Sequence, residues 1–126
     1  MVAEAKLWGD VEATVRSWAR SVMTEVNGRV FFGANNQAAM PQIVLFRVSG
    51  PDDQVLIQFD VWATTKAQAA QLAAALATAA DGVHGYDSDG VVLKAATVEG
   101  SSWQPDEESN TARYIVQVTF AAWAFQ

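Results

Sequence analysis

The longest regular pattern along the chain is the alternation at its C-terminal end. Residues 113–126 read RYIVQVTFAAWAFQ, with apolar side chains at every second position from Tyr114 to Ala124. Successive side chains of a strand point to opposite faces, so the pattern predicts a strand with one apolar face. The opposite face begins polar and ends in Trp123 and Phe125. We expect that apolar end to pack on something outside the subunit's own small domain.

Two helices are predicted from apolar spacing and capping signals. Residues 10–26 carry apolar side chains at spacings of four, three and four, with Asp10 as a suitable N-cap and Asn27-Gly28 as a stop. Residues 65–68, Thr-Lys-Ala-Gln, fit a capping box and open a second helix that extends to about Ala80. The inner stripe of the second helix is expected to consist of Ala69, Leu72, Ala73, Leu76 and Ala80.

The remaining segments predict strands. These are a short strand at residues 29–32, two strands at 42–49 and 54–63 joined by a turn, a strand at 90–99 and the C-terminal strand, with an acidic loop at 100–111. The expected fold class is α+β, in the order α-β-β-β-α-β-β. It has a mainly antiparallel sheet of about four main strands plus a short strand, with two helices packed on one face. On length, residues 1–126 form a single domain.

The other face of the predicted sheet has no helix left to cover it. Its expected apolar residues are Leu56, Trp62, Ile115, Trp123 and Phe125. A monomer rarely exposes such a patch without a purpose, so the sequence predicts self-association. Met40 and Trp103, in predicted loops, are further candidates for contact with a subunit or partner. Trp18 lies on a helix stripe and is expected in the core. Trp8, Trp62, Trp103 and Trp123 fit either core packing or a subunit contact.

Charge and composition narrow the function classes. The net charge is −6, and between residues 81 and 110 there are seven acids and a single base, Lys94. This balance disfavours tight DNA binding, which needs clustered Lys and Arg. The absence of Cys excludes disulfides and thiol chemistry. No apolar run approaches the roughly twenty residues of a membrane helix, and the first residues do not resemble a secretion signal.

Motifs for catalysis or metal binding do not emerge from the sequence. His84 is the only histidine, and no serine–carboxylate or metal-ligand spacing accompanies it. If Gly90 is aligned to the sixth position of a calcium loop, Gly85 and Ala96 fall where Asp and Glu are required. Asp106, Glu107 and Glu108 fit a solvated loop better than a metal site. We therefore expect no enzyme activity, cofactor or metal.

Taken in order, several segments resemble the tail-terminator (tail-completion, or tail-to-head joining) proteins of long-tailed bacteriophages and phage-like particles. These segments are Val11-Glu-Ala-Thr-Val-Arg-Ser-Trp18, Gly28-Arg-Val-Phe31, the strand from Pro41 to Gly50, Ile57-Gln-Phe-Asp-Val-Trp-Ala63, and the strand from Arg113 to Trp123. The resemblance covers about residues 11–125 and lies in the order and spacing of core patterns.

The resemblance implies a structural, non-enzymatic virion protein that forms a ring, as a homo-oligomer expected to be a hexamer. Such a ring caps the tail-tube protein, ends its polymerisation and offers a surface to the head connector or completion protein. DNA only passes through its lumen, and no membrane is involved. The protein would lie at the head-proximal end of the tail and be assembled in the bacterial host cytoplasm. The acidic residues Asp106, Glu107 and Glu108 would then line the lumen or rim.

Two other functions fit the same sequence. A head-completion or connector ring protein shares the small α+β architecture and ring assembly, but attaches to capsids instead of tube ends. A small-ligand-binding α+β dimer, with His84 lining a pocket, would require a cavity within the monomer.

Overall fold

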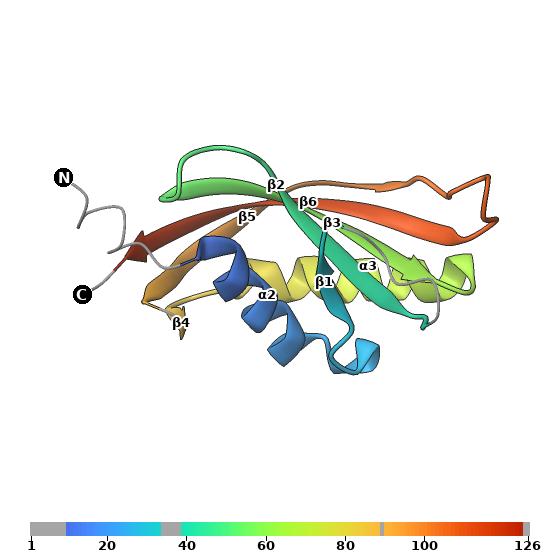
Figure 1. Ribbon diagram of the computed structural model, residues 1–126, viewed down its shortest axis with the longest axis horizontal. Helices are drawn as coiled ribbons and strands as arrows, with labels where there is room; N and C mark the ends of the chain where they lie inside the picture. The colour runs from blue at the N-terminus through green and yellow to red at the C-terminus, as the bar shows by residue number, and fades with distance from the viewer. Residues whose placement is uncertain (1–9, 34–38, 89, 125–126) are drawn as a thin grey trace.

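The computed structural model describes residues 10–33, 39–88 and 90–124, which form two helices and a six-stranded sheet (Figure 1). Its elements, in chain order, are helix α2 (Val11–Val22), the 3-10 turn η1 (Thr24–Val26), strands β1 (Val30–Phe32), β2 (Gln42–Ser49) and β3 (Gln54–Ala63), helix α3 (Lys66–Asp81), and strands β4 (Tyr86–Ser88), β5 (Val91–Trp103) and β6 (Ala112–Ala124).

The strand order across the sheet is β1-β2-β3-β6-β5-β4. Strands β1 and β2 run parallel and every other neighbouring pair is antiparallel, so the sheet is mixed. The predicted α+β class is confirmed, and both helices lie on one side of the sheet (Figure 1). The predicted element list is wrong in lacking β4. That strand has only three residues, Tyr86–Ser88, which is too short to display an alternation.

The two helices begin where the capping signals predict. The Asp10 carboxylate accepts a hydrogen bond from the Ala13 amide at 3.0 Å, and the Thr65 hydroxyl accepts one from the Gln68 amide at 3.1 Å. The buried residues of α3 are Ala69, Leu72, Ala73, Leu76 and Ala80, which confirms the predicted stripe. Helix α2 ends at Val22, earlier than predicted, because the chain tightens into η1 before a left-handed residue at Asn27.

The core lies between the helices and the sheet face that they cover. At its centre three aromatic rings meet edge to face: Trp18 from α2, Phe59 from β3 and Phe120 from β6. The ring centroids of Trp18 and Phe120 are 5.4 Å apart, and those of Phe59 and Phe120 are 6.1 Å apart. Such pairs stabilise a core beyond the effect of buried area. The predicted core position of Trp18 is confirmed.

Strands β5 and β6 form a long hairpin where a loop was expected. Strand β5 continues to Trp103, so the prediction of a loop is wrong for residues 100–103. Residues 104–111 form the connection, in which an isolated bridge joins Asp106 to Thr111. Two register shifts, between Leu93 and Ala95 and between Val98 and Gly100, interrupt the pairing with β6. The second bulge breaks the alternation where the predicted strand stops, which hides residues 100–103 from a pattern of period two.

The outer side of β5 is mostly unpaired. Strand β4 pairs with only the first three residues of β5, Val91–Leu93. From Lys94 to Trp103, β5 borders no further strand in the described part of the chain. The sheet therefore has an open edge along most of its longest hairpin.

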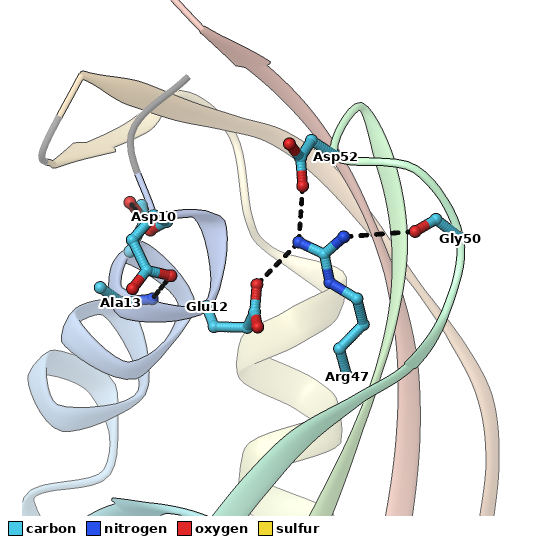
Figure 2. Close-up of polar contacts among 7 residues, drawn as sticks. Asp10, Glu12, Ala13, Arg47, Gly50 and Asp52 are labelled. Atoms are coloured by element: carbon cyan, nitrogen blue, oxygen red, sulfur yellow. Dashed lines mark hydrogen bonds and ion pairs between the residues drawn. The ribbon is translucent and has the colours of Figure 1, made fainter. Parts of the chain in front are cut away.

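An arginine joins α2 to the β2–β3 turn (Figure 2). One terminal nitrogen of Arg47 lies 2.7 Å from Glu12 in the first turn of α2 and 2.6 Å from Asp52 in the turn. Its other terminal nitrogen donates to the Gly50 carbonyl at 3.3 Å. Burial opposes the charge of Arg47, but the hydrogen bonds to Asp52 and Glu12 outweigh it and raise the pKa of the guanidinium. Arg47 therefore fixes where the helix starts relative to the turn.

Arg47→Met is expected to lower the free energy of unfolding by about 1 kcal/mol, because it leaves two facing carboxylates without their shared cation. The effect stays modest since all three side chains are partly solvent-exposed. Urea unfolding followed by circular dichroism measures the difference. The control is Lys94→Met on exposed β5, expected to change stability by less than about 0.5 kcal/mol. Equal effects of the two changes would contradict the role of Arg47.

Candidate assembly surface

Three large apolar side chains are exposed on the sheet face turned away from both helices. Phe46 and Val48 of β2 and Trp123 of β6 are 37%, 45% and 58% exposed. Leu56 and Ile115 on the same face are half-buried. No described helix covers this face (Figure 1). We call it the helix-free face.

The predicted contact residues do not all lie on this face. Leu56, Ile115 and Trp123 do, as expected from the alternation, and Met40 is half-buried just before β2. Phe125 and Trp8 lie outside the described residues. Trp103 is the last residue of β5 and packs on the helix side, where its ring centroid lies 5.4 Å from that of Tyr114 and 5.0 Å from the Lys66 ammonium. The structure therefore does not bring Trp103 to the helix-free face.

Trp62 lies on the helix-free face but is only 6% exposed, so its expected place in an exposed patch is wrong. The guanidinium of Arg113, its cross-strand neighbour, lies 4.9 Å from its ring centre and covers it. A cation over an aromatic ring is favourable, and it removes the ring from solvent. The indole nitrogen is buried and has no hydrogen-bond partner among the described residues.

A row of polar side chains crosses the middle of the helix-free face on β3 and β6. The Gln117 amide donates to Gln58 at 3.1 Å, and the Gln58 amide donates to Asp60 at 2.9 Å. Asp60 lies 3.7 Å from a terminal nitrogen of Arg113, whose Nε donates to the Gln104 carbonyl at 2.8 Å. Each member fixes the next, so the row is held in one arrangement before any partner arrives.

Beside this row lies a hollow of about 420 Å³. Its lining residues are Gln58, Gly100, Ser101, Ser102, Gln104, Ile115 and Gln117. The second bulge of β5 brings small residues, Gly100 and Ser102, opposite the larger side chains of β6. Amides and hydroxyls dominate the lining, so this part of the face offers hydrogen bonds instead of charge.

The acidic residues predicted for a lumen or rim lie at the tip of the β5–β6 hairpin. The Ser109 hydroxyl donates to the Asp106 carboxylate at 2.6 Å, and the backbones of Asp106 and Thr111 exchange two hydrogen bonds. The hydrogen bond from Ser109 holds the pKa of Asp106 below its ordinary value. Glu107 and Glu108 are exposed at the turn itself. The hairpin therefore ends in a small, ordered acidic surface.

The structure brings no catalytic constellation together in its described residues. His84 is exposed in the connection between α3 and β4. Within residues 10–33, 39–88 and 90–124, no three His, Cys, Asp or Glu side chains are grouped as a metal site would require. No helix in these ranges is long and apolar enough to cross a membrane.

Sequence reasoning missed two apolar members of the helix-free face, Phe46 and Val48. The signal was present, because the hairpin pairing that was predicted for β2 and β3 puts Phe46 opposite Gln58, on the same side as Leu56. Arg113 was likewise treated as the polar start of a strand, and its cover over Trp62 depends on a residue that is distant in the chain.

The chain matches known proteins by structure and not by sequence. No family model matches the chain, and no curated protein matches it by sequence. Chains of solved structures do match, 21 of them, including one from the virion of a native gene transfer agent (GTA) particle. That chain is similar with a TM-score of 0.51 and 18% sequence identity, over 89% of this chain and 90% of that one. The two therefore share a fold across nearly their whole lengths.

Proposed function

We propose that this chain is a structural, non-enzymatic subunit of a phage-like virion. It assembles with copies of itself into a ring at the end of a tail tube, stops tube growth and presents a docking surface for the head connector. The observation that carries the proposal is the helix-free face, where apolar side chains ending in an exposed Trp123 surround an ordered polar row. The fold shared with a chain of the GTA virion supports the same class of function.

The helix-free face suits a contact between subunits. Aromatic residues are enriched at the centres of interfaces, and polar side chains that are already ordered add hydrogen bonds at little entropic cost. Contacts between unlike patches on neighbouring copies close into a ring when the rotation between subunits closes. A ring whose two ends differ can bind a tube end through one end, while its other end does not bind a further ring of tube protein.

Polymerisation of the cognate tail-tube protein in vitro tests this function. Adding the purified chain is expected to shorten the tubes and to place a ring at one end, seen by negative-stain electron microscopy. Because a cap acts at ends, substoichiometric amounts relative to tube protein suffice. Binding of the chain to purified tail-less capsids, with tubes unaffected, would instead support the head-completion alternative. Unaffected tubes together with no capsid binding would contradict both.

A further inference from the structure

Two arginines on α2 form a basic surface that has no acidic partner in the part of the chain that the structure describes. Arg16 and Arg20 lie one turn apart and line a hollow of about 300 Å³ with Ala13 and Ser17. Neither guanidinium has an ion pair among the described residues, because Glu12, one turn before Arg16, is bonded to Arg47 instead. We call Arg16 and Arg20 the basic pair.

The basic pair is held in place by contacts that leave its charge unneutralised. Arg16 lies over the ring of Phe32 at 5.0 Å, and Arg20 donates to the Val30 carbonyl at 3.3 Å. The Nε of Arg16 is buried and finds no hydrogen-bond partner within the described ranges. Burial and the nearby charge of Arg16 lower the pKa of Arg20. Like charges one helical turn apart repel, so the isolated subunit carries an unfavourable interaction that an incoming carboxylate would relieve.

The surroundings of the basic pair are those of an interface. Phe32 of β1 is 41% exposed and lies beside the basic pair, since the Arg16 guanidinium is 5.0 Å from the centre of its ring. Arginine together with exposed aromatic surface is the composition that protein contacts favour. The chain has a net charge of −6, so the basic pair is also a local excess of positive charge on an acidic protein.

The acidic surface that complements the basic pair lies on the same chain, but too far away for the two to touch within one subunit. Glu107 and Glu108 are exposed at the tip of the β5–β6 hairpin and have no ion pair among the described residues. That tip and α2 lie toward opposite ends of the long axis of the molecule (Figure 1). The basic pair borders β1 at one edge of the sheet, whereas the hairpin is built on β5 and β6 near the other edge.

We propose that the acidic hairpin tip of one copy docks on the basic pair of the next copy, with Glu107 and Glu108 facing Arg16 and Arg20. The contact joins unlike patches from opposite edges of the sheet, so it is heterologous and can repeat around a ring. The Asp106–Thr111 bridge and the Ser109 hydroxyl keep the tip ordered before it binds. The inference rests on the proposed ring function and assigns the acidic tip to a subunit contact instead of the lumen wall.

Charge reversal on each side tests the contact. Arg16→Glu/Arg20→Glu and Glu107→Lys/Glu108→Lys are each expected to weaken self-association at least tenfold, as measured by sedimentation velocity at physiological salt. An equimolar mixture of the two variants is expected to restore assembly. The acidic helix of the first variant then faces the basic hairpin tip of the second, and the native tip of the first faces the native basic pair of the second. Assembly of the unmodified protein is expected to weaken as NaCl rises, since salt screens such pairs.

Asp81→Lys/Glu99→Lys is the matched control for Glu107→Lys/Glu108→Lys, because it makes the same change in net charge at two exposed residues outside the contact. It is expected to assemble like the unmodified chain. If thermal melting shows that either reversed variant is not folded, the neutral variants Arg16→Gln/Arg20→Gln and Glu107→Gln/Glu108→Gln replace them. Each is expected to weaken assembly to a smaller extent. Acids that only line a lumen would tolerate this neutralisation.

The outcomes separate the two proposals. If the unmodified chain assembles and either reversed variant assembles equally well, or if the mixture does not restore assembly, the tip contact is wrong and the ring function stands. If the unmodified chain assembles only on tube ends, the same variants are compared by counting capped tubes in electron micrographs. If it neither self-associates nor caps tubes, both proposals fall.

Discussion

Trp123→Asp is expected to prevent ring assembly at concentrations where the unmodified chain assembles, while leaving the monomer folded. The side chain is 58% exposed on the helix-free face, so its loss changes monomer stability by only about 0.5 kcal/mol. In an interface core, an aromatic anchor of this kind contributes about 2 kcal/mol or more, which corresponds to roughly 30-fold in affinity. The new carboxylate would also have to lose its water at the contact.

Sedimentation velocity measures the assembly of Trp123→Asp, and circular dichroism with thermal melting measures its fold. Ala74→Asp provides a matched control, since it adds the same charge on the exposed side of α3. His84→Ala is a second control outside the proposed surfaces. Both are expected to assemble normally. Rings of Trp123→Asp that form as readily as those of the unmodified chain would remove the helix-free face from the assembly contact.

Phe120→Ala is expected to lower the free energy of unfolding by about 3–5 kcal/mol. The ring is fully buried between Trp18 and Phe59, and its removal leaves a cavity that two rigid rings and a sheet cannot close. Since a domain of this size has a total stability of roughly 5–15 kcal/mol, the variant retains little margin. Chemical denaturation with an unchanged slope against denaturant measures the loss.

Phe46→Ala is the matched control for Phe120→Ala, because the same atoms are removed from the helix-free face. Phe46 is 37% exposed, so its truncation is expected to cost about 1–2 kcal/mol, well below the loss at Phe120. The two variants then report different properties, the first stability and the second assembly. Similar losses of stability in both would mean that the helix-free face is as well packed as the core.

The helices were predictable from the sequence because their signals are local. Asp10 and Thr65 cap their helices within three residues, and the stripe of α3 repeats within a single element. The edges of the sheet were not predictable in the same way. Strand β1 has three residues and pairs parallel with β2, which no local pattern reveals, and β4 is likewise too short to display an alternation.

For residues on strands, the sequence predicted the face of the sheet but not the exposure of each side chain. Alternation gave the correct side for Leu56, Trp62, Ile115 and Trp123, but it does not reveal what lies over each side chain. Arg113 covers Trp62, whereas no described side chain buries Trp123 in that way. The two arginines of the basic pair are visibly one turn apart in the sequence, but Glu12 stands one turn before Arg16 as an apparent partner, and only the structure shows that Glu12 binds Arg47 instead.

The open edge of β5 has a consequence for solubility. A long unpaired strand is a template onto which other chains add indefinitely, as in amyloid. In this strand the two bulges leave Lys94 and Glu99 without partners on β6, so each irregularity coincides with a charged residue. An incoming strand would find its hydrogen-bond ladder interrupted twice within ten residues and two charges to desolvate. Both features oppose fibril growth from this edge of the sheet.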